Sequence, residues 1–245
     1  MGNRKGIEAL LRSQPFSESV TGEDSVYHYA ESMARVENTL VVVSDIKANT
    51  SRIFYGRFAD VLSIRSLPHE NSIWEKEILA QMDESEQEGK YLSELRFFNF
   101  LRRIPHSFRP YYYLAAHLRI KNKRGIAVDV LHRMYYWYEG GSEVVRYGIC
   151  VYGPLLQPLP AKYMAVNSVT GEVQELSGSN DQDILSKREK QILSLIVKGL
   201  TSQEIADMLC ISKHTVSRHR QEILAKLQAR NSAGAILRAR QLQLI

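Results

Sequence analysis

Hydrophobic and polar positions follow two different patterns along the chain, with a change near residue 177. Before that point, alternating or β-branched runs predict strands over residues 39–44, 51–55, 111–120, 126–138 and 144–152. Apolar residues at helical spacing predict helices over residues 7–12, 22–37, 58–63, 73–82 and 84–103. Beyond residue 185 every element has helical spacing. The pattern therefore predicts an α+β fold followed by an all-α part.

Turn residues connect the three longest strands into an antiparallel meander. The segments 122–125 and 139–142 contain Asn-Lys-Arg-Gly and Glu-Gly-Gly-Ser, which favour tight hairpin turns. Residues 163–166 and 172–176 predict one more hairpin around a Ser-Val-Thr-Gly turn. An antiparallel sheet with flanking helices is thus expected in the N-terminal part.

Four short helices with their own start signals are expected in the last sixty residues. Ser186 with Glu189, and Thr201 with Glu204, have the spacing of capping boxes, in which side chain and backbone at a helix start bond each other. Ser212 is placed to cap a third helix over residues 213–227, and a fourth follows over 232–242. The spacing of the middle two helices is that of a helix-turn-helix DNA reader.

The third helix of this set has an apolar side and a polar side. Val216, Ile223 and Leu227 share one side, which can hold the helix on its neighbours. Polar and basic residues cover the rest, namely Lys213, Ser217, Arg218, Arg220 and Gln221. The polar side is therefore expected to face outward.

The positive charge of the chain is concentrated in its last sixty residues. Residues 186–245 contain 11 Lys and Arg against 4 Asp and Glu, a net charge of 11 − 4 = +7. Because the whole chain carries +5, the first 185 residues carry 5 − 7 = −2. A basic module beside an acidic remainder is expected of a nucleic-acid binder, since contacts with phosphates release counterions.

These last sixty residues resemble the LuxR/FixJ-type helix-turn-helix family. The matching residues are Leu185-Ser186-x-Arg188-Glu189, Leu195, Gly199, Glu204-Ile205-Ala206, Leu209, Ile211-Ser212, Thr215-Val216, His219, Ile223, Lys226-Leu227, Asn231 and Ala235. The resemblance implies a four-helix module whose third helix enters the major groove, with the fourth helix often pairing two modules. Many members have a basic residue where this chain has Ser217.

The resemblance also assigns roles along the third helix. It places Ser217, Arg218 and Gln221 at base-reading positions, while Lys213 and Lys226 lie near the DNA backbone. Thr215 and His219 would face phosphate or hold the helix. The complete set of candidate DNA-binding residues is Lys213, Thr215, Val216, Ser217, Arg218, His219, Arg220, Gln221 and Lys226.

Residues 38–154 resemble PAS domains in the order of their elements. The resemblance rests on residues 37–45, 119–125 and 147–152 and on two strands, small helices, one longer helix and a three-strand meander. It implies a pocket between the sheet and its small helices that holds a ligand or cofactor, or a sheet that mediates dimerisation. No cofactor is required, although a haem would need one of the histidines as an axial ligand: His28, His69, His106, His117 or His132.

Four domain segments follow: a helical lead over residues 1–37, a PAS-like sensory or dimerisation domain over 38–176, a linker over 177–184, and the DNA-binding domain over 185–245. No apolar run reaches the ~20 residues of a membrane helix. Cys150 and Cys210 lie in different segments without metal-type spacing, which favours a reducing cytoplasm.

The expected function is a transcription regulator, acting as a homodimer on double-stranded DNA, whose N-terminal domain senses a small ligand or mediates dimerisation. A phosphoacceptor receiver is disfavoured because Asp45 ends its strand without an acidic partner. A homoserine-lactone domain is disfavoured by the setting of Trp74 and Trp137. No catalytic set is found in residues 1–183, so we expect no enzyme. A scaffold that joins a protein partner through its sheet, and a haem sensor, remain alternatives.

Overall fold

The computed structural model describes residues 2–16, 23–64, 69–140, 142–177, 185–227, 229, 231–241 and 244. It divides into an N-terminal unit, Ile7–Leu176, and a C-terminal unit, Ser177–Ile245, which also takes in Met1–Gly6. Apart from Ser177, the predicted linker lies outside the described residues. None of the described helices is long and apolar enough to cross a membrane.

The N-terminal unit is built on one sheet whose strands all pair antiparallel, in the order β3-β2-β1-β6-β5-β4-β7-β8. Its strands are β1 (Leu40–Asp45), β2 (Thr50–Tyr55), β3 (His69–Glu70), β4 (Tyr112–Lys121), β5 (Ala127–Tyr138), β6 (Val145–Pro154), β7 (Tyr163–Asn167) and β8 (Val173–Glu175). Its helices are α1 (Gly2–Arg12), of which Ile7–Arg12 belong to this unit, α2 (Glu23–Val36), α3 (Phe58–Leu62), α4 (Lys76–Leu79), α5 (Glu84–Arg103) and the short 3-10 helix His106–Tyr111. The α+β prediction is confirmed.

Several elements differ from the expected pattern: α1 begins at Gly2 instead of residue 7, and the 3-10 helix His106–Tyr111 was not predicted. Strand β3 was not predicted, because two residues that pair with the edge of β2 are too short to show a period. The helix expected over residues 73–82 is helical only from Lys76 to Leu79. Side-chain bonds fix the residues before it: the Ser72 hydroxyl accepts from the Trp74 N–H, and Glu70 accepts from the Lys76 N–H. These bonds compete with helical hydrogen bonds.

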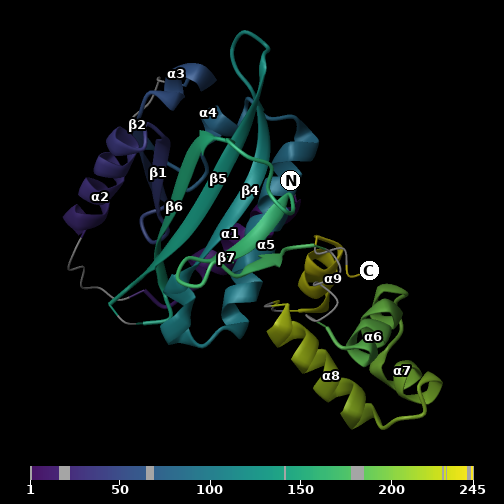
Figure 1. Cartoon of the computed structure of the whole chain (residues 1–245). Helices are drawn as coiled ribbons and strands as arrows, with labels where there is room; N and C mark the ends of the chain where they lie inside the picture. Colours follow the sequence, from purple (N-terminus) through teal and green to yellow (C-terminus); the bar gives the residue numbers. More distant parts are fainter. Residues whose placement is uncertain are drawn as a thin grey trace. The chain divides into compact units, whose positions relative to one another are not determined.

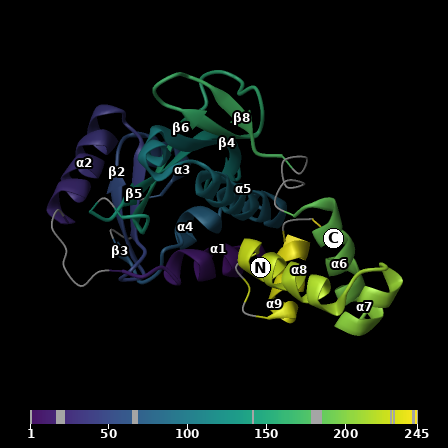
Figure 2. The same ribbon diagram turned by 90° about the horizontal axis from the view of Figure 1, so that it is seen from below.

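Helix α2 covers one face of the sheet and α5 lies over the other (Figure 1; Figure 2). Small residues of α2, including Ala30 and Ala34, pack on Val41, Val43 and other buried residues of β1 and β6. On the opposite face, the Tyr136 ring stacks on Phe97 with centroids 5.7 Å apart. Neighbouring aromatic residues of β5 therefore point to opposite faces, as strand geometry predicts.

The C-terminal unit contains the four predicted helices, α6 (Lys187–Val197), α7 (Ser202–Met208), α8 (Lys213–Lys226) and α9 (Ser232–Gln241). Both predicted capping boxes are present, at Ser186 with Glu189 and at Thr201 with Glu204. In each, the carboxylate also accepts from the N–H of the capping residue, at 2.6 and 2.7 Å. The helix starts are therefore fixed by local sequence.

An ion pair joins α6 to α8. Lys226 Nζ donates to Glu189 Oε2 at 2.7 Å, and the side chain of Glu189 is only 2% exposed. Burial raises the pKa of Glu189, but the hydrogen bonds from Lys226 and Ser186 outweigh it and hold the pKa below its ordinary value. The charged form is thus favoured in the folded state.

Gly56 is a position where the N-terminal fold leaves no room for a side chain. A Cβ there would lie 2.3 Å from the Ala34 carbonyl oxygen and 2.4 Å from that of Thr39. We expect Gly56→Ala to lower the free energy of unfolding by about 1–3 kcal/mol, because backbone atoms must move. Gly148→Ala, where nothing lies within 4 Å, is the matched control and should be close to neutral in urea unfolding. Equal effects of the two substitutions would contradict the steric reason.

Glu189→Gln should weaken the α6–α8 contact at neutral pH. Since the folded pKa of Glu189 is depressed, its stabilisation is complete above the ordinary carboxylate pKa and is lost as the pH falls through the lower folded value. We expect a loss of about 1 kcal/mol at pH 7, reduced by the partial exposure of Lys226, measured by hydrogen exchange of α6 and α8 amides. The difference should vanish in acid; a pH-independent difference, or the same profile in Asp207→Asn, would contradict this.

Candidate nucleic-acid interface

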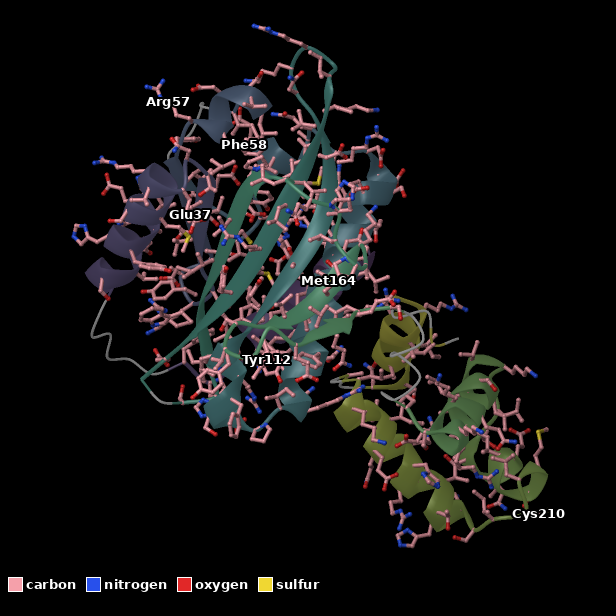
Figure 3. The ribbon with its side chains drawn as sticks, in the orientation of Figure 1. Glu37, Arg57, Phe58, Tyr112, Met164 and Cys210 are labelled. Atoms are coloured by element: carbon pink, nitrogen blue, oxygen red, sulfur yellow. The ribbon has the colours of Figure 1, made fainter. Side chains whose placement is uncertain are left out.

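A tight turn between α7 and α8 sets the direction of α8. Cys210 has a φ of +52°, and the Ile211 N–H donates back to the Ala206 carbonyl at 3.0 Å. Figure 3 shows Cys210 at the tip of this turn. The Ser212 hydroxyl then accepts from the Thr215 N–H at 3.0 Å and starts α8. A tight turn followed at once by a capped helix is the geometry of a helix-turn-helix.

The inner side of α8 is fully buried. Val216 and Ile223 have no exposed surface, and Leu227 is 2% exposed. These three residues share the apolar side of the helix, which is separate from its polar positions, and they anchor the helix on α6 and α7. Val216, a candidate DNA-binding residue from the sequence, therefore supports the helix from behind and cannot reach a nucleic acid.

The two flanks of α8 are held by polar contacts within the unit. On one flank, Arg220 donates to the hydroxyls of Ser202 at 3.1 Å and Ser232 at 2.9 Å, which are the first residues of α7 and α9. On the other flank, Lys226 binds Glu189, and His219 Nδ1 lies 3.1 Å from Glu222 Oε2. Arg220 and Lys226 thus fix the orientation of α8, whereas the His219–Glu222 contact lies within α8 itself.

The outer face of α8 carries the side chains that are open to a ligand. Lys213, Arg218 and Gln221 are exposed, while Ser217 is half-buried between them. Arg218 is 67% exposed and its Nε lies 3.4 Å from Glu222, an exposed pair that costs little to break. These four predicted residues lie on one continuous face. Its charges and amide can contact phosphates and base edges.

Thr215 and His214 complete the start of this face. Thr215 is half-buried and its hydroxyl lies 2.9 Å from that of Ser212, so its observed role is at the helix cap. His214 is exposed and was missed by the sequence analysis. Its position three and four residues before Ser217 and Arg218 is the signal that would have placed it on the same face.

The N-terminal unit contains a small cavity between α5 and the sheet. Its volume is about 30 Å³, and its lining includes Glu75, Lys90, Glu94, Tyr136 and Cys150. A volume of this size holds a water molecule or an ion, whereas organic ligands occupy pockets of roughly 300 Å³ or more. A haem or another organic cofactor would therefore fit this cavity only after a large rearrangement.

Of the candidate haem ligands, only His132 lies beside this cavity's residues. His132 is completely buried on β5 and stacks on Tyr152, with ring centroids 4.7 Å apart. His117 instead bonds Asp129 at 2.8 Å at the surface, and His28 is exposed on α2. The five histidines do not converge on one site.

Comparison with known proteins identifies the C-terminal residues. Residues 183–239 match the model described as bacterial regulatory proteins, luxR family. The oxygen regulatory protein NreC of Staphylococcus aureus (strain JH9) is 39% identical over 74 residues, covering 26% of this chain and 34% of that protein. The chain thus spans about a third of the length of this relative.

Two solved structures are similar over most of the chain at low identity. The phage VqmA–DPO complex covers 90% of both chains with 16% identity and a TM-score of 0.33. Escherichia coli SdiA covers 99% of this chain and 98% of its own, with 17% identity and a TM-score of 0.28. The family match, by contrast, coincides with the capped helices described above, and residues 183–239 therefore form a helix-turn-helix domain of the luxR family of bacterial regulatory proteins.

Proposed function

We propose that the protein is a sequence-specific DNA-binding transcription regulator. The single observation that supports this best is the outer face of α8, where Lys213, Ser217, Arg218 and Gln221 are open while both flanks of the helix are fixed. The net charge of +7 over residues 186–245 supplies the electrostatic attraction to phosphates. The relatives named as regulators support the same proposal.

Within this proposal the exposed residues have different roles. Arg218 and Gln221, near the middle of the exposed face, read base edges in the major groove. Lys213, at the first turn, binds a backbone phosphate, and its contact carries no sequence information. Ser217 lies between them and allows close approach because its side chain is short. Arg220 and Lys226 act indirectly, by holding the helix.

The N-terminal unit is proposed to be a PAS-like domain that responds to a signal or mediates homodimerisation. The sheet contains the strand order β2-β1-β6-β5-β4. Along the chain, two small helices and α5 lie between β2 and β4, which is the element order on which the PAS resemblance rests. As a dimer, two α8 helices could meet successive major-groove faces ~34 Å apart. A change in the N-terminal unit would then alter binding by biasing the arrangement of the two readers.

A comparison of two arginines on one helix tests the DNA-binding face. Arg218→Ala should leave the melting temperature of the C-terminal unit unchanged and reduce discrimination between operator and mismatched DNA roughly tenfold or more, about 1–3 kcal/mol. Arg220→Ala removes the same charge but should lower the melting temperature, because two helix starts lose a partner. The measurement is binding to an operator selected by the wild-type protein from random double-stranded DNA.

Lys213→Ala provides the second control. It should lower the affinity for all DNA sequences equally, and the slope of log affinity against log salt should decrease by about one, the contribution of one phosphate contact. Equal losses on every sequence for Lys213→Ala and Arg218→Ala would contradict the assigned roles. Absence of salt-dependent binding to any double-stranded DNA would contradict the proposed function itself.

A further inference from the structure

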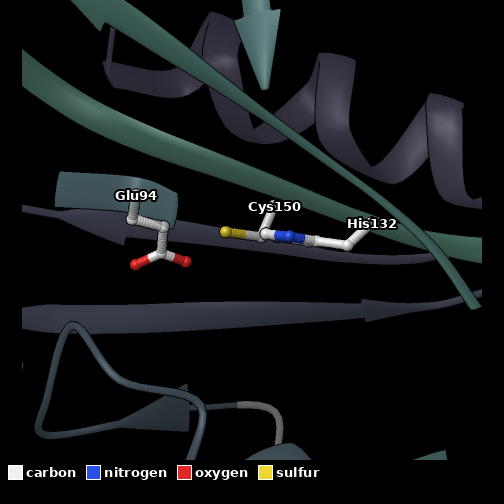
Figure 4. A group of neighbouring side chains, drawn as sticks. All are labelled: Glu94, His132 and Cys150. Carbon is white, nitrogen blue, oxygen red and sulfur yellow. The ribbon is translucent and has the colours of Figure 1, made fainter. Parts of the chain in front are cut away.

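The buried polar cluster between α5, β5 and β6 lies far from the DNA-reading face in sequence and takes no part in it. It contains Glu94 of α5, His132 of β5 and Cys150 of β6, all buried (Figure 4). One ligand atom from each, a carboxylate oxygen, a ring nitrogen and the sulfur, lies within 4.8 Å of the other two. In the view of Figure 4 the sulfur lies between the carboxylate and the imidazole.

His132 is the unusual member of this cluster. It is 0% exposed, and neither ring nitrogen has a hydrogen-bond partner among the residues that the structure describes. Burial, and then the charge of Lys90, hold the pKa of His132 well below its ordinary value, so the ring is neutral and offers a lone pair. A buried polar group without a partner destabilises the fold unless something binds it.

The spacing of the three atoms fits a small metal ion. Three atoms no more than 4.8 Å apart have a common point at most 4.8/√3, about 2.8 Å, from each. Zinc is bound by sulfur at ~2.3 Å, by nitrogen at ~2.0–2.1 Å and by oxygen at ~2.0–2.2 Å. Movements of at most about 0.5 Å for the sulfur and about 0.8 Å for the nitrogen and oxygen, available to side-chain rotation, would bring all three within binding distance.

The charges around the cluster also favour a cation. Glu75 and Glu94 provide two carboxylates near a single ammonium, that of Lys90, whose Nζ donates to Glu94 Oε1 at 2.6 Å and lies 3.5 Å from Glu75 Oε2. A carboxylate has two oxygens, so Glu94 can bind Lys90 through one and a metal through the other. A divalent ion that binds a thiolate adds a net charge of one, which balances the excess carboxylate.

The size of the neighbouring cavity selects an ion over an organic molecule. Its volume of about 30 Å³ is bordered by Cys150 and Glu94, together with Glu75 and Lys90. Glu75 accepts from the Tyr152 hydroxyl at 3.2 Å through Oε1, and its Oε2 lies 3.5 Å from Lys90 Nζ. Glu75 thus provides a further carboxylate on this cavity for a fourth coordination position.

We propose that Glu94, His132 and Cys150 form a buried site for a divalent transition metal of the zinc class. A neutral imidazole, a thiolate and a carboxylate match zinc better than magnesium or calcium, which prefer oxygen ligands. On binding, the Cys150 S–H proton leaves to solvent, a sulfur–metal bond forms, and no electron is transferred. The ion ties the long helix α5 to two central strands of the sheet.

Metal content of the full-length protein provides the test. The chain is stripped with a chelator, dialysed against Zn²⁺, and its metal-to-protein ratio measured; Co²⁺ is then substituted and the thiolate-to-cobalt absorption band recorded. We expect one tightly held metal per chain and a cobalt band. Cys210→Ser, which changes the exposed cysteine, should retain both, whereas Cys150→Ser should lose the band and bind zinc at least tenfold more weakly.

Glu94→Gln and His132→Gln serve as further variants. Each should weaken zinc binding at least tenfold while the thiolate band of any bound cobalt persists, which keeps the test informative if Cys150→Ser does not fold. The proposal is overturned if the wild-type chain retains no stoichiometric metal, or if Cys150→Ser, folded by circular dichroism, retains it unchanged. It is also overturned if His219→Gln, at the partly buried Glu189–His219–Glu222 group, is the substitution that removes the metal.

Discussion

The interaction on which the C-terminal unit depends is the anchoring of α8 by its buried side and both flanks. Val216 and Ile223 remove its apolar side from water, and the Glu189–Lys226 and Arg220–serine contacts prevent rotation about its axis. A helix fixed in this way presents one defined face without ordering it again on binding, which lowers the entropic cost of recognition. In return, the charged side chains of Glu189, Lys226 and Arg220 are bound within the unit.

These internal contacts explain why charge alone is a poor guide to which side chains of α8 are open to a ligand. Arg218 and Arg220 are two positions apart and chemically identical, yet a helix places them on different faces. One is exposed and the other bridges Ser202 and Ser232. The sequence placed both in the interface because their periodic positions are compatible with a broad polar face. Only the positions of α7 and α9 show which of the two arginines is already hydrogen-bonded within the unit.

Much of the fold followed from local sequence, because it is determined locally. The capping boxes at Ser186 and Thr201, the hairpin turns and the alternating strands depend on neighbours a few residues away. The short strand β3 and the packing of α2 on the sheet could not be derived in the same way, since they depend on partners far along the chain. In the candidate interface, the outward positions were predictable from helical spacing, whereas the Glu189–Lys226 contact joins residues 37 apart.

The N-terminal unit shows the same limit in its buried polar groups. Glu94, His132 and Cys150 are 18 or more positions apart in sequence and have no recognisable spacing, because two strands and a helix bring them together. Strand register does this directly: His132 pairs with Tyr152 and Met134 with Cys150, so His132 and Cys150 are diagonal neighbours on one face. A core built mainly of apolar residues tolerates such a cluster only where its members satisfy one another or a bound ion. Glu75, Lys90 and Glu94 bond one another, whereas the His132 imidazole and the Tyr136 hydroxyl have no partner among the described residues.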